Sequence, residues 1–396
     1  MLTSLALIFL CGLLMASLCQ KLKLPGLVGM LLTGILLGPF ALNLLDDTIL
    51  SLSADLRQMA LIIILARAGL SLDWQDLKRI GRPAVLMSFV PACFEMAGTI
   101  LIAPCLLNIP LLDAAILAAV VASASPAVIV PRMVRLIESG YGTDKSIPQL
   151  ILAGDSVDDV FNIVVFSSLI GFSGGEEIAL SRFAQIPLSI LSGIAAGLMV
   201  GFLLAKLFQK IHMRDSVKLL VLLSLSFLLI AVEDMLPASI AFSGLIAVMA
   251  AGVALLQALP PVAGRLSARL SRLWVAAEVL LFALVGAGLD ITCAVEAGGK
   301  TLLMLAAILL MRAVGIALCL LGTNLNRRER LFCTLTGIPK ATVQAAIGGI
   351  PLALGLPNGA LILAVAVLTI LITAPLGAWA LDNTYKHLLT QSTNPH

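Results

Sequence analysis

Three carboxylates stand within five positions of an otherwise apolar stretch, residues 154–163: Asp155, Asp158 and Asp159 in "GDSVDDVFNI". At about 100° per residue in a helix, these residues and Asn162 share one face that is roughly 100° wide. Closely spaced carboxylates in a low dielectric do not all ionise readily, so at least one should exchange a proton near neutral pH. Carboxylate oxygens also suit a hard cation such as Na⁺. The spacing therefore predicts a site where a cation and a proton compete.

The composition places this stretch in a membrane. Of the 396 residues, 60% are hydrophobic and 12% are charged, whereas roughly a quarter of the residues in soluble domains are charged. No basic run interleaved with aromatic residues indicates nucleic-acid binding, and the seven cysteines lack C-x-x-C spacing. The three histidines lie outside the apolar segments, which excludes a histidine relay there. No metal-binding or nucleophile constellation indicates an enzyme.

Thirteen apolar segments approach the roughly 20 residues that a helix needs to cross a bilayer. They are residues 2–19, 24–43, 56–72, 83–107, 113–134, 148–172, 186–206, 217–233, 237–258, 274–290, 301–322, 331–352 and 359–380. With the N-terminus outside, nineteen lysines and arginines fall in cytoplasmic loops and three in outer loops, as the positive-inside rule requires. The basic loops could instead bind lipids, but their alternation along the chain favours topology. We therefore predict an all-α polytopic membrane protein with about 13 transmembrane helices and a cytoplasmic C-terminus.

Four of the predicted helices carry ionisable residues near mid-membrane depth. These are Glu95, the pair Asp158 and Asp159, Arg312 and Lys340. A charge that faces lipid at this depth is costly, so such groups face the interior of a helix bundle and commonly mark an ion or proton pathway. The alternative is that these residues form buried salt bridges that only hold helices together. For Glu95, this alternative is as well supported as a role in a pathway. Two adjacent aspartates favour the pathway.

The thirteen segments can be grouped as six, one and six. With an offset of seven segments, segments four, five and six correspond to segments eleven, twelve and thirteen. Because seven is odd, the two members of each pair cross the membrane in opposite directions. Segments five and twelve are partners and are the most interrupted, by "SASASPAVIVP" and "GIPKATVQAAIGGIP". Proline removes a backbone donor, and Ser, Thr or Gln can satisfy the freed groups or coordinate a cation. We predict an inverted-topology repeat with two crossed broken helices: residues 1–182, a linker helix in 183–210, and 211–396 with a short cytoplasmic tail. Prolines that only kink packed helices are the alternative.

Several stretches resemble one family, the monovalent cation/proton antiporter superfamily, and most closely the NHA branch of Na⁺/H⁺ antiporters. Its two signature regions resemble "SASASPAVIVPRMVRLIESGYGTDKSIPQLILAGDSVDDVFNI" and "GIPKATVQAAIG", and "ILARAGLSLD" and "PACFEMAG" are also similar to it. The resemblance covers the membrane segments nearly end to end. It implies a homodimer with a dimerisation domain and a core domain, an elevator-like motion, and no cofactor besides the transported Na⁺ or Li⁺ and H⁺.

The resemblance also implies roles for individual residues. Asp159 would be the principal ligand of Na⁺ and the proton carrier, with Asp158 as its partner. Arg312 would pair with Asp158 in some states, and Glu95 would pair with Arg312 or Lys340. The residues expected at the helix crossing are Ser123, Ser125, Pro126, Thr342 and Gln344. Asp155 departs from the family pattern and, with Asn162, is an accessory group; Asp155 could attract cations at a vestibule or be a second proton site.

These features predict a secondary active antiporter that exchanges Na⁺ or Li⁺, or less readily K⁺, for H⁺ by alternating access. It would be an integral protein of a bacterial inner (plasma) membrane, with monovalent cations, protons, membrane lipids and a second copy as partners and no nucleic acid. One alternative is a sodium-coupled organic-anion symporter of similar fold, which would need a second pocket with uncompensated cationic groups. Another is a cation channel or sensor, which would use the buried charges as a gate and pass current without obligatory exchange.

Overall fold

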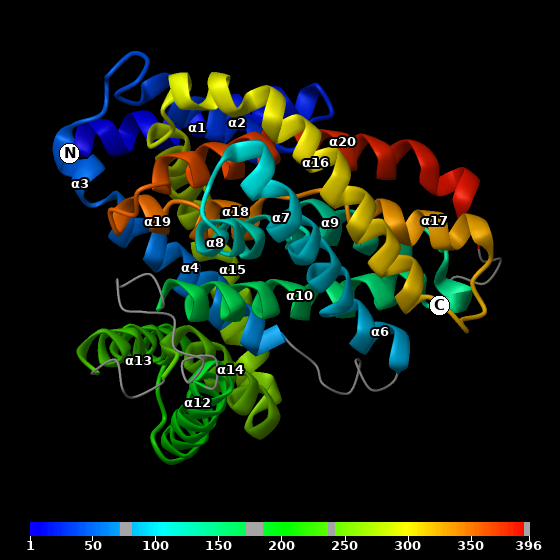
Figure 1. Cartoon of the computed structure of the whole chain (residues 1–396). Coiled ribbons are helices and arrows are strands. Elements are labelled where there is room, and N and C mark those ends of the chain that lie inside the picture. The colour runs from blue at the N-terminus through cyan, green and yellow to red at the C-terminus, as the bar shows by residue number, and fades with distance from the viewer. Residues whose placement is uncertain (72–80, 172–184, 237–241, 392–396) are drawn as a thin grey trace. The chain divides into compact units, whose positions relative to one another are not determined.

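The computed structural model describes residues 1–71, 81–171, 185–236 and 242–391 of the chain. In these residues the regular elements are helices, accompanied by one isolated β-bridge between Tyr141 and Gln391 (Figure 1). The chain forms two compact units. The first comprises residues 1–54, 74–163 and 281–396, and the second comprises residues 55–73 and 164–280. Every predicted site residue belongs to the first unit.

The first unit contains the broken helices. Its elements are α1 (Leu2–Lys21), α2 (Gly26–Leu37), α3 (Asp47–Ser51), α6 (Arg82–Met87), α7 (Val90–Leu107), α8 (Leu111–Val121), α9 (Pro126–Glu138), η1 (Thr143–Lys145), most of α10 (Ile147–Ile170), the last turns of α15 (Pro260–Ala287), α16 (Ile291–Cys319), α17 (Arg327–Leu335), α18 (Thr342–Ile347), α19 (Ile350–Ala353) and α20 (Gly359–Leu388). The second unit holds most of α4 (Ser53–Ser71), with α12 (Gln185–Lys210), α13 (Asp215–Met235), α14 (Gly244–Ala258) and the rest of α15.

Eight spans in the described residues are long and apolar enough to cross a membrane. They are Leu2–Lys21, Arg82–Leu107, Leu111–Glu138, Leu188–Lys210, Asp215–Glu233, Pro260–Ala287, Ile291–Cys319 and Gly359–Leu388. Three shorter apolar helices are Gly26–Leu37, Gly244–Ala258 and Thr342–Ala353. Each of the thirteen segments predicted from the sequence overlaps a described helix, and the all-helical membrane class is correct. The count of thirteen crossings and the repeat stay predictions.

Several helices extend well beyond the apolar segment that predicted them. The tenth segment was predicted to begin at residue 274, but α15 begins at Pro260 and includes Arg265 and Arg269. Asp215 at the start of α13 accepts a hydrogen bond from Arg265 (2.9 Å), and Ser216 accepts one from Arg269 (2.6 Å). A hydropathy window ends at such charges, whereas the backbone hydrogen bonds of the helix continue past the bilayer.

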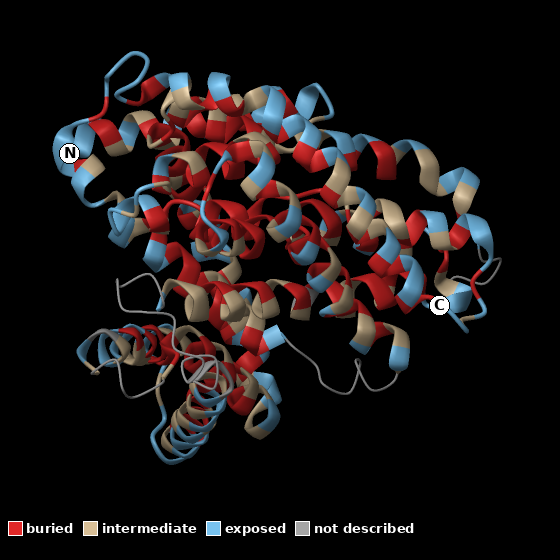
Figure 2. Cartoon of the chain, viewed as in Figure 1, coloured by how far each residue is buried: buried red, intermediate tan, exposed pale blue. Residues whose placement is uncertain are grey.

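Both predicted helix interruptions are present. Residues 122–125 separate α8 from α9, and residues 336–341 separate α17 from α18. Pro126 is the first residue of α9, where its missing N–H has no intrahelical partner to lose. Helix α18 is buried on all sides and α8 on nearly all (Figure 2). Helices that are buried all round face protein rather than lipid, so the two breaks lie inside the first unit.

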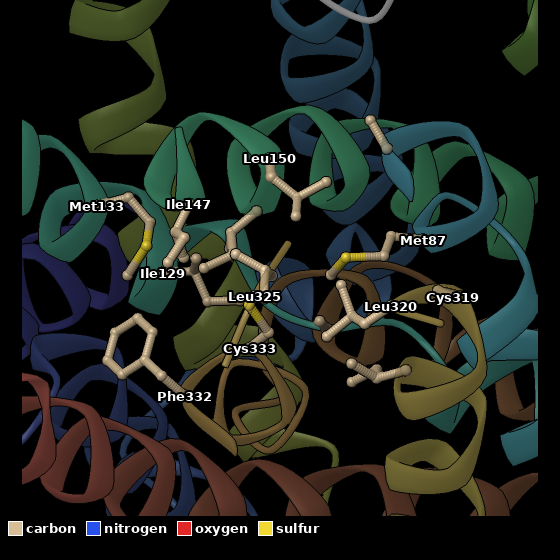
Figure 3. Packing of buried hydrophobic residues seen from close by; sticks show 14 of the residues in the cluster. Met87, Ile129, Met133, Ile147, Leu150, Cys319, Leu320, Leu325, Phe332 and Cys333 are labelled. Carbon is tan, nitrogen blue, oxygen red and sulfur yellow. The ribbon is translucent and has the colours of Figure 1, made fainter. Parts of the chain in front are cut away.

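An apolar cluster packs the helices on one side of the breaks. It joins α6, α9, α10, α16 and α17, and its fully buried members include Met133, Ile147 and Phe332 (Figure 3). Two groups of ion pairs involve residues that are near members of this cluster in the sequence. Lys145 pairs with Glu329 (2.8 Å), and Arg132 and Arg135 pair with Asp382 (2.8 and 2.9 Å). Together with the cluster, these contacts join α9, α10, α17 and α20.

Glycine allows α2 to pack backbone to backbone on the end of α15. A Cβ added at Gly34 would overlap the Ala283 carbonyl, and one at Gly286 would overlap the Leu31 carbonyl. Small residues permit this close approach between membrane helices.

We therefore expect Gly34→Ala to destabilise the fold by roughly 1–3 kcal/mol, because the added methyl group forces the two helices apart. The measurement is the thermal denaturation midpoint in detergent. Gly299→Ala is the matched control, since Gly299 is exposed in α16 and no atom lies within 4 Å of its added Cβ. Equal midpoints for the two variants would contradict this account of the helix contact.

Candidate functional site

The two helix breaks cross and hydrogen-bond to each other. The backbone N–H of Ser125 donates to the carbonyl of Pro339 (2.9 Å), and the hydroxyls of Ser125 and Thr342 are 3.1 Å apart. From the second break, the side-chain amide of Gln344 donates to the carbonyl of Ser123 (2.9 Å). The carbonyl and amide groups that unwinding releases are thus partly satisfied across the crossing. The structure brings together the residues that were predicted to meet there.

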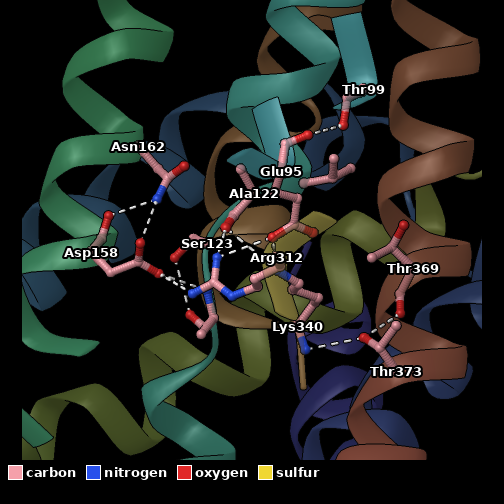
Figure 4. Close-up of polar contacts among 12 residues, drawn as sticks. Glu95, Thr99, Ala122, Ser123, Asp158, Asn162, Arg312, Lys340, Thr369 and Thr373 are labelled. Atoms are coloured by element: carbon pink, nitrogen blue, oxygen red, sulfur yellow. Dashed lines mark hydrogen bonds and ion pairs between the residues drawn. The ribbon is translucent and has the colours of Figure 1, made fainter. Parts of the chain in front are cut away.

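A chain of buried charges lies beside the crossing (Figure 4). The guanidinium of Arg312 on α16 bridges Glu95 on α7 (3.0 Å) and Asp158 on α10 (2.8 Å). Lys340 in the second break reaches the same oxygen of Glu95 (2.6 Å). The exposed fractions of these four residues are 0% for Glu95 and Lys340, 1% for Asp158 and 4% for Arg312. The prediction left open which cation Glu95 would contact, and in the structure it contacts both.

The same two cations also bind the backbone of the first break. Arg312 and Lys340 both donate to the carbonyl of Ala122, Lys340 at 3.3 Å. The backbone N–H of Lys340 in turn donates to the Thr373 hydroxyl on α20 (3.0 Å). Ala122 and Thr373 were not singled out from the sequence. Thr373 could have been noticed because it stands four residues after Thr369 in an otherwise apolar helix. The Ala122 carbonyl could not, because a backbone group acts here and the identity of the side chain does not indicate it.

Asp158 is fully engaged in this arrangement. Besides Arg312, its carboxylate accepts a hydrogen bond from the backbone N–H of Ala124 (3.0 Å). The side-chain amide of Asn162 donates to the Asp158 carbonyl (2.7 Å) and lies 3.4 Å from its carboxylate. Asp158 therefore connects α10 to the unwound residues of the first break and to α16.

Among the described residues, Asp159 and Asp155 have no such cationic partners. Asp159 is half-buried and accepts a hydrogen bond from the hydroxyl of Ser123 in the first break. Asp155 is buried on the same helix, as the shared face of the predicted helix requires. Neither residue forms an ion pair with the residues that the structure describes.

The buried cluster therefore contains more carboxylates than cations. Its acidic members are the buried Glu95, Asp155 and Asp158 and the half-buried Asp159, and its basic members are Arg312 and Lys340. Arg312 and Lys340 are bound to Glu95 and Asp158, so the two other carboxylates are left to be compensated in some other way. Buried carboxylates without a cation favour a bound proton or a bound cation.

Residues 5–381 match the family model of the sodium/hydrogen exchanger transmembrane domain. The chain belongs to the sodium/hydrogen exchanger family. This confirms the cation/proton antiporter assignment made from the sequence, and the family is one of transporters rather than enzymes. The organic-anion symporter and channel alternatives gain no support.

Relatives in animals are similar to this exchanger over most of its length. It is 32% identical to sodium/hydrogen exchanger 9B2 of Mus musculus, over 90% of this chain and 66% of the relative, and 32% identical to the Homo sapiens protein over 90% and 68%. Sodium/hydrogen exchanger 9B1 of Homo sapiens is 31% identical over 94% of this chain and 74% of its own length. This exchanger thus spans about two thirds to three quarters of these proteins.

A solved structure shares the fold of this exchanger. The sodium proton antiporter MjNhaP1 from Methanocaldococcus jannaschii at pH 8 superposes with a TM-score of 0.86 over 98% of both chains, at 23% identity. At that identity the match concerns the fold. It agrees with the all-helical fold of the described residues.

Proposed function

We propose that this exchanger moves Na⁺ or Li⁺ against H⁺ by alternating access, and that Asp159 binds the cation and the proton in turn. The observation that supports this choice is the difference between the two adjacent aspartates. Arg312 neutralises Asp158, whereas Asp159 contacts the Ser123 hydroxyl at the helix break and has no ion-pair partner in the described chain. Asp159 is thus the carboxylate that is available for a transported ion.

Competition at Asp159 is sufficient to couple the two fluxes. A protonated carboxyl group cannot ligate Na⁺ well, and a carboxylate that ligates Na⁺ resists protonation. Further ligands for a hard cation would be oxygens such as the Ser123 hydroxyl and carbonyl groups of the unwound segments. Arg312 does not deprotonate in proteins, so it would stabilise the site rather than carry a proton.

The proposed framework is the one predicted from the sequence. It has thirteen spans arranged as 6+1+6, with residues 1–182 and 211–396 as inverted repeats and a linker helix within 183–210. It also has an outside N-terminus, a cytoplasmic C-terminus and a homodimeric assembly. Interruptions in α8/α9 and α17/α18 and the distribution of basic residues support the repeat and the orientation. Placement in a bacterial inner membrane stays a prediction.

Proton release from sealed proteoliposomes tests the function directly. Purified protein is reconstituted with a pH-sensitive dye and an imposed acidic interior, and Na⁺, Li⁺, K⁺ or choline is added outside. We expect Na⁺ and Li⁺ to release protons, K⁺ to release fewer and choline to release none. Absence of cation-driven proton release would refute the proposal. A current without exchange would indicate a channel, and a requirement for an organic anion would indicate a symporter.

A further inference from the structure

A small cavity lies between α10, α16 and the second helix break. Its volume is about 20 Å³, which is room for one water molecule or small ion. The polar side chains that line it are Asp155, Asp158, Arg312 and Thr336, and its other walls include Met87 and Ile316. Two carboxylates and a guanidinium thus line the same small space.

Two of these side chains have atoms without a hydrogen-bond partner in the described residues. One is the acceptor Oδ2 of Asp155, a residue with an exposed fraction of 8%, and the other is the donor Nε of Arg312. The Nε atom faces Gly337, which also lines the cavity, since a Cβ at residue 337 would lie 3.0 Å from it. Buried polar atoms in folded proteins nearly always have partners. Two residues of opposite charge that line the same cavity, Asp155 and Arg312, therefore each have one buried polar atom without a partner in the described residues.

The remaining nitrogens of Arg312 are occupied by Glu95 and Asp158. A cation held by Asp159 would lie next to Asp158 in the chain. The Oδ2 atom of Asp158 is held by Arg312 and by the Ala124 N–H, so Asp158 could turn both of its oxygens toward that cation only after releasing Arg312. An arginine released inside a membrane protein needs another anion, because an unpaired buried charge is strongly unfavourable. Asp155 is the carboxylate that already lines the cavity beside Arg312 and has an oxygen to spare.

We propose that Asp155 is the alternate counter-ion of Arg312: when a cation binds at Asp159, the guanidinium exchanges Asp158 for Asp155 across this cavity. Arg312 keeps Glu95 throughout and always has two anions. Asp155 is then a positioning residue that acts through Arg312 and need not contact the transported ion. The inference rests on the proposed function and adds to it the step that frees the second aspartate.

The test is the Na⁺ dependence of proton release by Asp155→Asn in proteoliposomes. The variant loses a charge-assisted partner of Arg312 only in the Na⁺-bound state, so we expect the KM for Na⁺ to rise about tenfold. Asp155 has no ion pair with any residue that the structure describes, so the Tm without Na⁺ should not fall. The increase in Tm that Na⁺ produces should become smaller for the same reason. Asp155→Glu keeps the charge and should recover much of the Na⁺ affinity.

Asp382→Asn is the matched control. It removes the partner of Arg132 and Arg135, and since none of these three residues lines the cavity, it should lower the Tm without changing the KM for Na⁺. A wild-type KM for Asp155→Asn, or a Na⁺-free Tm lowered as far as that of Asp382→Asn, would overturn the inference. If the wild-type protein itself releases no protons with Na⁺ or Li⁺, the proposed function fails; if it does, and the KM does not shift, this inference alone fails.

Discussion

Replacing Asp159 by asparagine is expected to abolish Na⁺-driven and Li⁺-driven proton release while the protein stays folded. Asparagine is nearly isosteric and can still accept a hydrogen bond from Ser123, but it neither ionises nor carries a proton at this position. Because Asp159 has no cationic partner in the described chain, its replacement leaves no buried cation uncompensated. Transport should fall to the level of empty vesicles, and the Tm should change by only a few degrees.

The control for this experiment is Asp47→Asn, the same chemical change at an exposed position in α3. It should transport like the wild type. Asp159→Asn protein that retains wild-type Na⁺-driven proton release would show that another group carries the proton. Asp158→Asn is informative beside it, since it leaves Arg312 with one anion fewer and should lower the Tm as well as the activity.

The largest loss of stability is expected for Arg312→Ala. This residue bridges Glu95 and Asp158 and donates to the Ala122 carbonyl, so it joins α7, α10, α16 and the first break. Removing one partner of a buried ion pair typically destabilises a protein by about 3–5 kcal/mol, because it leaves an uncompensated buried charge. We expect a large decrease in Tm together with loss of transport. Arg328→Ala, at an exposed position of α17, is the control and should change neither.

A double variant separates the contributions of charge and of packing to the loss of stability in Arg312→Ala. If the instability of Arg312→Ala comes from unpaired carboxylates, then adding Asp158→Asn should restore part of the lost Tm, a non-additive result in a double-mutant cycle. Arg312→Lys should be intermediate, because an ammonium cannot bridge two carboxylates in the way that a planar guanidinium does. Strict additivity of the two substitutions would contradict the proposed ion-pair network.

Local patterns predicted the elements that carry the site. The face of α10 with Asp155, Asp158 and Asn162 follows from helical periodicity, and these three residues are buried in the structure. The two breaks follow from proline, glycine and serine in partner segments, because these residues act on the backbone of their own helix. Helix ends were less accurate, as α15 shows, because charged residues end a hydropathy window without ending a helix.

The sequence by itself determined the membrane class, the family, and the set of ionisable residues that lie within apolar segments. Only the tertiary structure decided which of them form ion pairs: Arg312 with both Glu95 and Asp158, and Lys340 with Glu95. It also decided how the two breaks meet, through the hydrogen bond from the Ser125 N–H to the Pro339 carbonyl. It also distinguished Asp159 from its neighbour and placed the spare oxygen of Asp155 on a cavity beside Arg312. The physical reason is distance along the chain. Periodicity is a property of neighbouring residues, whereas these partners lie on different helices and meet only through helix packing.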